Sequence, residues 1–329
     1  MRFLQIGLGS MGKRRIRCLQ RLGFRDITGF DMRADRRDEA ARLYGVATTD
    51  KVSSELFGLF DAVLISTSPA HHLEYMKMSV ESRRPTFIEA SILPEGLAAI
   101  DRAARKKNVF MAPSCTLMFH PAVKIIKAAV LGGKYGKLTD FSYHSGSYLP
   151  DWHPWEPLKG FFASQKKTGA CKEIIPVELT WLCDIAGLPA RVVSLYGRTT
   201  DIGAPIDDTY IIALKFRQGF GALIVDAVSR NAVRRLILNM ERGQVIWHWE
   251  NDWLDIYEAS SRKWKRVTFK LGKAEKGYNK SIAESMYLDE IRAFVKGLGN
   301  RALYPNTLAK DLGVLSILEK ADKKYGPKR

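Results

Sequence analysis

The first third of the chain alternates short apolar runs with segments of helical spacing. The apolar runs are RFLQI, DITGF, FDAVLI, PTFI and VFMA. After the first run, Ile16, Leu19 and Leu22 recur at the spacing of one helix face. Two further helices are expected, from about His72 to Ser82 and from about Pro94 to Lys107. Continuous apolar strands are typical of parallel sheets that helices cover on both faces, so the pattern predicts an α/β fold with a doubly wound parallel sheet.

Alternation of apolar and polar residues replaces this pattern later in the chain. It is clearest in DTYIIALKFRQGFGALIVDAVSR and RRLILNMERGQVIWHWEND, with a turn expected at Gln218 and Gly219. Such alternation is typical of antiparallel strands that bury one face. A chain of 329 residues is also longer than one core usually supports. We therefore expect two domains, placed at residues 1–118 and 119–329.

A glycine-rich turn joins the first apolar run to the first helix. Gly7, Gly9 and Gly12 have the G-x-G-x-x-G spacing, with Ser10 and Met11 between the last two. In a strand-turn-helix context the first glycine permits the tight turn and the second lets the backbone approach a pyrophosphate. The third lets the helix pack closely on the strand. The turn therefore predicts a dinucleotide site in residues 1–118, with the helical N–H groups facing the phosphates.

The second strand ends in Asp31, near the distance at which an acidic residue would hydrogen-bond the adenosine ribose hydroxyls. This favours NAD as the cofactor. Arg33, Arg36 and Arg37 follow directly, and their charges could neutralise the 2′-phosphate of NADP. They could equally be a solvated helix start, so NADP stays open as an alternative.

The composition is that of a folded globular protein, with 46% hydrophobic and 26% charged residues. The formal net charge of +17 attracts anions, which include nucleic acids, membrane surfaces, dinucleotides and phosphorylated metabolites. The basic residues are spread along the chain, and no helix-turn-helix, RRM or zinc-finger pattern accompanies them. We therefore expect an anionic small molecule as the ligand, and neither nucleic acid nor a membrane as a partner.

The four cysteines, Cys18, Cys115, Cys171 and Cys183, are far apart and lack CxxC spacing. Neither a zinc site nor a disulfide framework is indicated, and we expect no metal site. No apolar stretch approaches the roughly 20 residues of a membrane helix, and the chain opens directly on a structured motif. The expected location is the cytoplasm.

Several motifs together resemble the Gfo/Idh/MocA family of NAD(P)-dependent oxidoreductases, which act mostly on sugars, nucleotide sugars and cyclitols. The stretches GLGSMGKRRIR, STSPAHH, FIEAS, TLMFHPAV and YLPDWHPWEP are similar to family segments, and the resemblance covers nearly the whole chain. It implies an N-terminal Rossmann domain and a C-terminal α/β domain with a large, open, mainly antiparallel sheet. It also implies closing helices that pack on the first domain, and a homodimer or homotetramer.

The resemblance extends the set of expected cofactor contacts beyond the glycine turn. It implies that Glu89 binds the nicotinamide ribose and that the loop after FDAVLI lies against the cofactor. The residues added to the cofactor site are Ser66, Thr67, Ser68, His72 and Glu89, beside Gly7, Gly9, Ser10, Met11, Gly12, Asp31 and Arg33.

The chain departs from the family at the residues that move the proton. Ala90 stands at the position of the family's lysine and Ser91 at that of the proline after it. Glu173, Val177 and Thr180 replace an Asp, a His and an Asp that share one helix face. Neither alanine nor valine can exchange a proton, and general acid/base groups contribute roughly 10²- to 10⁴-fold to rate. Pro176 also suggests that this helix begins near it.

Other titratable groups could take over proton transfer, and for each a structural role is an open alternative. His153, Lys172 and Glu173 are the candidate catalytic residues. Around His153, the aromatic residues of the YLPDWHPW loop suit a sugar ring. The candidate substrate contacts are Tyr148, Trp152, Trp155 and His120.

Two functional hypotheses follow from these departures. In the first, the protein is an NAD(P)-dependent oxidoreductase that transfers hydride to or from a sugar, nucleotide sugar or cyclitol with non-standard proton-transfer residues. An anionic sugar derivative is the expected substrate, because of the positive charge. In the second, it is a catalytically silent relative that binds nucleotide as a sensor or scaffold.

Overall fold

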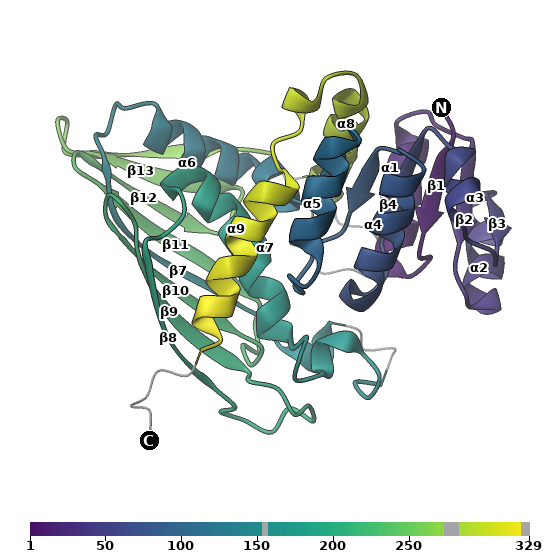
Figure 1. The fold of residues 1–329 in the computed structure, drawn as a ribbon. Helices are drawn as coiled ribbons and strands as arrows, with labels where there is room; N and C mark the ends of the chain where they lie inside the picture. The colour runs from purple at the N-terminus through teal and green to yellow at the C-terminus, as the bar shows by residue number, and fades with distance from the viewer. Residues whose placement is uncertain (153–156, 271, 273–282, 324–329) are drawn as a thin grey trace. The chain divides into compact units, whose positions relative to one another are not determined.

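The computed structural model describes residues 1–152, 157–270, 272 and 283–323, which form two compact units (Figure 1). The N-terminal unit comprises Met1–Phe119 and Glu284–Leu312. The C-terminal unit comprises His120–Ala283 and Gly313–Arg329.

The N-terminal unit is built on a six-stranded, fully parallel sheet in the order β3-β2-β1-β4-β5-β6. Its strands are β1 (Phe3–Ile6), β2 (Ile27–Phe30), β3 (Ala47–Thr49), β4 (Ala62–Ile65), β5 (Thr86–Ile88) and β6 (Met111–Pro113). All residues of β1 and β4 are buried, as their continuous apolar runs predict. The predicted doubly wound parallel sheet is confirmed. The chain reverses its direction of strand addition between β1 and β4, and such a switch point is where sheets of this kind bind ligands.

Helices of the N-terminal unit connect these strands, and one returns from near the end of the chain. They are α1 (Ser10–Arg21), α2 (Ala34–Tyr44), α3 (Ser54–Gly58), α4 (His72–Glu81), α5 (Leu97–Lys106) and α8 (Glu284–Gly299), with 3-10 turns at Pro69–His71, Thr116–Phe119 and Arg301–Leu303. Helix α8 packs against α1. Its buried Phe294 contacts the rings of Phe87 and Phe110, so a late segment completes the core of the first unit.

The C-terminal unit contains an eight-stranded sheet in the order β14-β13-β12-β11-β7-β10-β9-β8. All neighbours are antiparallel except β7 and β10. The strands are β7 (Leu138–Gly146), β8 (Arg191–Gly197), β9 (Thr209–Lys215), β10 (Phe220–Asp226), β11 (Val233–Met240), β12 (Gly243–His248), β13 (Trp253–Glu258) and β14 (Lys263–Thr268). The expected mainly antiparallel sheet is confirmed. Gly219 forms the predicted turn at φ +83°, where a Cβ would lie 2.3 Å from the Thr139 carbonyl oxygen.

Helices of the C-terminal unit lie on one face of this sheet (Figure 1). They are α6 (Pro121–Leu131) and α7 (Ala170–Ala186), with 3-10 turns at Leu149–Asp151 and Phe162–Ser164; α9 (Leu308–Ala321) begins in the N-terminal unit and ends in the C-terminal unit. Strand residues therefore alternate between a helix-covered face and an open one, as in β9, where burial alternates along Thr209–Lys215.

The expectation that a helix begins near Pro176 is wrong. Helix α7 starts at Ala170, and Pro176 lies inside it. A proline has no N–H to donate to the carbonyl four residues earlier, so one hydrogen bond of the helix is missing. Tertiary packing compensates, because Pro176 and its neighbours Ile174 and Ile175 are buried. The side chain of Thr180 also donates a hydrogen bond of 2.7 Å to the Pro176 carbonyl oxygen.

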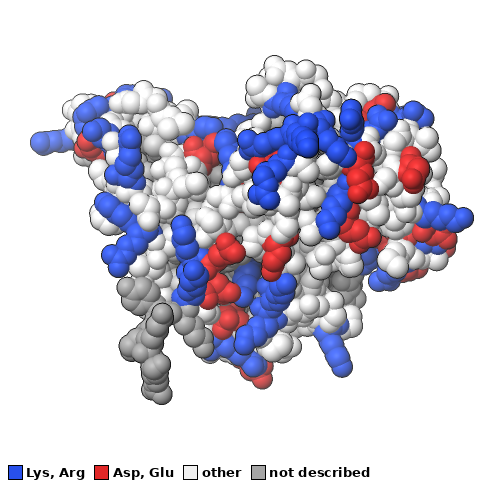
Figure 2. Space-filling model, in the orientation of Figure 1, with Lys and Arg blue, Asp and Glu red and all other residues white. Residues whose placement is uncertain are grey.

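Charged side chains of both signs share the face of the molecule that Figure 2 shows. On the face shown in Figure 2, acidic side chains lie among the more numerous lysines and arginines. No helix within the described residues is both long enough and apolar enough to cross a membrane.

Candidate functional site

The glycine turn has the close contacts that its sequence predicts. Gly7 follows β1 at φ +86°, and a Cβ there would lie 2.6 Å from the Ser66 carbonyl oxygen. A Cβ on Gly12 would lie 1.8 Å from the carbonyl oxygen of Gly7. Helix α1 begins directly after Gly9, and its first turn carries no acidic side chain. No carboxylate of this first turn therefore neutralises the positive end of the helix dipole, which suits a phosphate.

Four predicted cofactor residues lie in a row along the carboxyl edge of the sheet. Ile6, Phe30, Ile65 and Ile88 end neighbouring strands in register, and Gly7, Asp31, Ser66 and Glu89 are the residues that follow them. The order across the sheet is Asp31, Gly7, Ser66, Glu89, because β2, β1, β4 and β5 are neighbours. One acidic residue thus flanks the glycine turn on each side.

Asp31 is buried beside the glycine turn and is oriented by backbone donors. Its Oδ2 accepts a hydrogen bond of 2.8 Å from the Leu8 N–H, and its Oδ1 accepts one of 3.0 Å from the Arg33 N–H. A carboxylate oxygen can accept more than one hydrogen bond. Asp31 is therefore pre-oriented and can still accept from ribose hydroxyls.

The three arginines after Asp31 have different surroundings. The Arg33 guanidinium pairs with Asp35 at 2.5 Å. Arg37 donates to the carbonyl oxygens of Asp31 and Met32 at 2.8 and 3.0 Å. Arg36 alone lies beside the Asp31 carboxylate, at 3.6 Å. The predicted cofactor residue Arg33 therefore directs its backbone N–H, and not its charge, at Asp31.

The loop after β4 is fixed by His72. The His72 ring lies 3.0 Å from the carbonyl oxygen of Thr67 through Nε2 and 3.1 Å from the hydroxyl of Ser91 through Nδ1. A carbonyl oxygen only accepts, so Nε2 carries the proton and Nδ1 accepts from Ser91. Burial lowers the pKa of His72 to about 4, which keeps the ring neutral. His72 thus ties the Ser66–Ser68 loop to the segment after Glu89.

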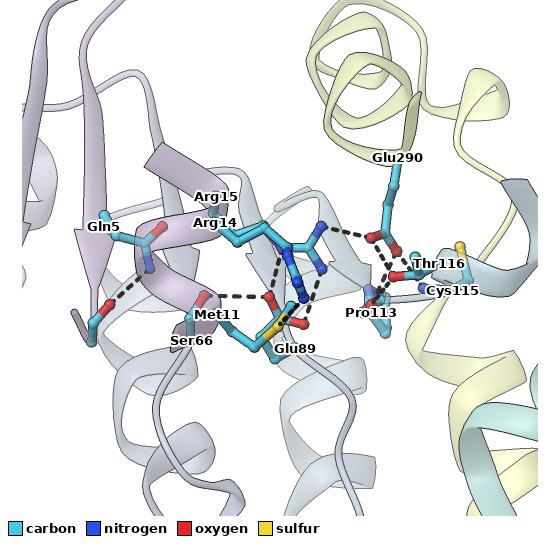
Figure 3. A network of polar contacts seen from close by, with 12 residues as sticks. Gln5, Met11, Arg14, Arg15, Ser66, Glu89, Pro113, Cys115, Thr116 and Glu290 are labelled. Atoms are coloured by element: carbon cyan, nitrogen blue, oxygen red, sulfur yellow. Dashed lines mark hydrogen bonds and ion pairs between the residues drawn. The ribbon is translucent and has the colours of Figure 1, made fainter. Parts of the chain in front are cut away.

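Glu89 belongs to a buried network that sequence reasoning did not find (Figure 3). Arg15 of α1 donates to both Glu89 carboxylate oxygens, at 2.6 and 3.0 Å, and to Glu290 of α8 at 2.8 Å. Glu290 also accepts from Ser114, Cys115 and Thr116 after β6, at 3.0, 2.6 and 2.7 Å. Arg15 and Glu290 are completely buried, whereas Glu89 keeps part of its side chain accessible. The network therefore orients an accessible carboxylate from beneath.

Lys172 and Glu173 lie in the first turn of α7. The Lys172 ammonium is 2.8 Å from Asp322 Oδ2, and the Tyr210 hydroxyl donates to Asp322 Oδ1 at 2.9 Å. Lys172 thus has a structural partner near the end of α9. Glu173, Val177 and Thr180 are partly exposed while their neighbours Ile174, Ile175, Pro176, Glu178 and Leu179 are buried, so the three share one helix face as predicted.

Glu178 lies on the buried side of α7, and its carboxylate accepts hydrogen bonds from four side chains. Its carboxylate accepts hydrogen bonds of 2.8 Å from the Tyr143 hydroxyl, 2.9 Å from the Ser145 hydroxyl, 3.1 Å from the Trp181 indole and 2.7 Å from Arg234. A carboxylate with this many donors is a structural centre of the C-terminal unit.

His120 caps α6 and packs among aromatic rings. Its Nδ1 accepts from the Ala122 N–H at 3.1 Å, so Nε2 carries the proton. The ring stacks on Trp249 at 4.7 Å between centroids and contacts Trp247 at 5.2 Å. Burial lowers its pKa to about 3. Within the described part of the chain, neither His120 Nε2 nor the indole nitrogens of Trp247 and Trp249 have a hydrogen-bond partner.

The described part of the YLPDWHPW loop contains Tyr148 and Trp152. The Tyr148 ring lies beneath the Arg230 guanidinium at 3.8 Å. The Trp152 indole donates to the Ser147 hydroxyl at 2.8 Å. The candidates His153 and Trp155 lie outside the described residues. The described residues contain no group of three or more His, Cys, Asp and Glu side chains that could hold a metal ion.

Comparisons with known proteins reveal the fold but no sequence relative. No protein-family model and no curated protein sequence matches the chain. An oxidoreductase from Agrobacterium radiobacter, solved with NAD+, L-tartaric acid and magnesium, is similar in structure at 13% identity. Its TM-score is 0.83, over 98% of this chain and 95% of that one.

Two further solved structures have the same arrangement. Levoglucosan dehydrogenase, in complex with NADH and levoglucosan, matches at 16% identity and a TM-score of 0.80, over 98% of this chain and 96% of that one. UDP-N-acetylglucosamine 3-dehydrogenase from Acidithiobacillus ferrooxidans matches at 16% identity and a TM-score of 0.78, with the same coverage. At such identities the likeness establishes a shared fold over almost the whole chain.

Proposed function

We propose that the protein is an NAD(P)-dependent oxidoreductase of the Gfo/Idh/MocA type. The observation that carries the proposal is the row of Asp31, Gly7, Ser66 and Glu89 along the carboxyl edge of the parallel sheet. Three neighbours of the same fold are named as an oxidoreductase or dehydrogenases, and two of them are solved with NAD+ or NADH. A shared fold alone would not support an activity, but residues in the places that a dinucleotide needs do.

The residues present fit a bound dinucleotide. In this proposal the glycine turn and α1 bind the pyrophosphate, Asp31 the adenosine ribose and Glu89 the nicotinamide ribose. The nicotinamide, when bound, accepts or donates hydride. Arg15 and His72 keep Glu89 and the loop after β4 in place through the contacts described above. Protein groups alone therefore orient the cofactor side of the proposed site.

The substrate we propose is a sugar, nucleotide sugar or cyclitol, with an anionic derivative favoured by the net charge of +17. Tyr148, Trp152, Trp155 and His120 are its proposed contacts. For proton transfer we propose His153 or Glu173 before Lys172, because the Lys172 ammonium is paired with Asp322. The proposed location is the cytoplasm.

The proposal is tested by titrating the purified protein with NADH and separately with NADPH. Energy transfer from tryptophan to the reduced nicotinamide reports binding. We expect NADH to bind and Asp31→Ala to weaken it, because the substitution removes the carboxylate beside the turn. If neither cofactor binds the wild-type protein, the oxidoreductase proposal is refuted.

A catalytically silent nucleotide-binding protein is the second candidate. It is favoured by Ala90 and Val177, which stand where the family resemblance implies a lysine and a histidine. The two candidates differ in turnover, measured as the change in nicotinamide absorbance with a panel of sugars, sugar acids, cyclitols and nucleotide sugars. Sustained turnover refutes the silent protein. Rates that stay within a few-fold in His153→Ala, Glu173→Gln and Lys172→Met would exclude these three residues as proton carriers.

We also propose that two or more chains associate through the open face of the eight-stranded sheet. The face that α6 and α7 leave open carries exposed apolar side chains on five strands: Leu195, Ile211, Phe220, Ile237 and Trp264. Exposed apolar side chains gathered on one face of a sheet support an interaction site there.

A further inference from the structure

Gln5 places an amide in the middle of a strand that is otherwise apolar. The other residues of β1 are Phe3, Leu4 and Ile6, and like Gln5 they are completely buried. The Oε1 atom of Gln5 has no hydrogen-bond partner among the described residues. A buried acceptor without a partner lowers stability, and an apolar side chain would avoid that loss. Packing of the core alone therefore does not explain a glutamine at this position.

The nitrogen of the Gln5 amide contacts the glycine turn (Figure 3). Gln5 Nε2 donates hydrogen bonds to the carbonyl oxygens of Ile6, at 3.1 Å, and of Gly7, at 3.2 Å. Because a carbonyl oxygen can only accept, the amide must present its nitrogen and not its oxygen to the turn. A Cβ on Gly12 would lie 3.3 Å from Gln5 Nε2, so the third glycine of the motif leaves space for this amide.

The peptide bond between Gly7 and Leu8 connects the Gln5 amide to Asp31. Its carbonyl oxygen accepts from Gln5 Nε2 at 3.2 Å, and its N–H donates to Asp31 Oδ2 at 2.8 Å. The C=O and the N–H of a planar trans peptide point in opposite directions, so a rotation of this peptide would break both hydrogen bonds. A side chain that fixes the carbonyl oxygen therefore also fixes the N–H that orients the Asp31 carboxylate.

We infer that Gln5 is a positioning residue for the proposed adenosine ribose site. Its amide orients the Gly7–Leu8 peptide, and the N–H of that peptide orients the carboxylate of Asp31. The inference rests on the proposed function, in which Asp31 accepts hydrogen bonds from the ribose hydroxyls. Gln5 itself is completely buried and does not contact the cofactor. Its effect on NADH affinity is therefore transmitted through Asp31.

The test is a double-mutant cycle on the dissociation constant for NADH, measured by tryptophan energy transfer. The four proteins are the wild type, Gln5→Leu, Asp31→Ala and the double variant. Leucine is apolar and donates no hydrogen bond, so Gln5→Leu should weaken NADH binding about 3- to 10-fold. In the Asp31→Ala background the same substitution should change the affinity by less than about twofold, because the carboxylate that Gln5 orients is absent.

Gln20→Leu is the matched control. Gln20 of α1 also donates from its amide to a backbone carbonyl oxygen, that of Tyr44, at 2.7 Å. Gln20→Leu therefore removes the same kind of hydrogen bond from the same unit without touching the glycine turn, and the NADH affinity should stay at the wild-type value. Gln5→Met is a second variant that lacks the donor, and thermal unfolding shows which variants are folded.

The outcomes separate this inference from the proposed function. If the wild type does not bind NADH, both are refuted. If it does bind, the role of Gln5 alone is refuted by an unchanged affinity in Gln5→Leu, by equal weakening with and without Asp31, or by equal weakening in Gln20→Leu. If neither Gln5→Leu nor Gln5→Met folds, Gln5 serves the core and its positioning role is likewise wrong.

Discussion

Arg15 donates two hydrogen bonds to the carboxylate of Glu89, a residue 74 positions away in the sequence, at 2.6 and 3.0 Å. Arg15 lies on α1, whose first turn we propose to bind the pyrophosphate, and Glu89 follows β5, where we propose the nicotinamide ribose. The pair thus links the two ends of the proposed cofactor site. Glu290 of α8 accepts a third hydrogen bond from Arg15, at 2.8 Å, so one guanidinium lies between two carboxylates.

Removal of the Arg15 charge should lower the free energy of unfolding. Arg15→Met leaves Glu89 and Glu290 close together without a cation, and removal of one partner from a buried ion pair typically costs about 3–5 kcal/mol. We expect the free energy of unfolding in urea to fall by an amount of this order. The NADH affinity of the remaining folded protein should also fall.

The double variant Arg15→Met/Glu89→Gln provides the control. Its loss of unfolding free energy should be smaller than the sum of the losses in the two single variants, because Glu89→Gln removes one of the unpaired carboxylates. Strictly additive losses would show that the two residues are not coupled.

The fold and the geometry of the glycine turn could be predicted from the sequence because both depend on local pattern. Apolar runs such as RFLQI form buried parallel strands, and the glycine spacing determines the turn at Gly7. The role of Arg15 could not be predicted, because KRRIR at a helix start looks like a solvated basic surface. Its burial depends on Glu89 and on Glu290, which α8 brings back from the far end of the chain.

Contacts from distant parts of the chain also decide the roles of Lys172 and Pro176. Lys172 resembles a free basic group until α9 places Asp322 beside it, 150 residues later in the sequence. Pro176 breaks isolated helices, but here the burial of its neighbours outweighs one missing hydrogen bond. Long-range packing thus decides the roles that local pattern leaves open.

Gly12 should not tolerate even an alanine. A Cβ there would lie 1.8 Å from the Gly7 carbonyl oxygen, so α1 or the turn must move. We expect Gly12→Ala to abolish measurable NADH binding and to destabilise the protein. Gly58→Ala is the matched control, since nothing lies within 4 Å of a Cβ there. Normal NADH binding by Gly12→Ala would show that the turn does not hold the cofactor.

Asp311 should make stability depend on pH. Burial raises its pKa from 3.8 to about 7, and its Oδ2 has no hydrogen-bond partner among the described residues. Between about pH 4 and 7 the folded state therefore binds this proton more tightly than the unfolded state does. The contribution of Asp311 to stability falls as pH rises through this range and stays low above it.

Asp311→Asn should remove this loss, because the amide stays neutral. We expect its Tm to exceed that of the wild type by at least about 3 °C at pH 8, and the two values to converge near pH 4. The informative quantity is the difference in Tm between Asp311→Asn and the wild type at each pH, because other groups titrate in both proteins. Burial lowers the pKa of His72 from 6.5 to about 4, so the folded state binds this proton less tightly than the unfolded state does. The contribution of His72 to stability therefore increases as pH rises from 4 to 6.5, and it does so equally in both proteins. If the difference in Tm between Asp311→Asn and the wild type does not vary with pH, the titration of Asp311 is not its cause.

The open face of the eight-stranded sheet should hold the chains together. Leu195, Ile211 and Ile224 are register partners on adjacent strands, so they form one apolar row across β8, β9 and β10. Ile211 is 49% exposed, and a charged residue there is compatible with a folded chain but not with a buried apolar interface. Ile211→Lys should therefore reduce the mass measured by light scattering to that of one chain. Leu43→Lys, at the equally exposed Leu43 of α2, should keep the wild-type mass. A wild-type protein with the mass of one chain, or an Ile211→Lys variant that stays associated, would rule out this face as the interface.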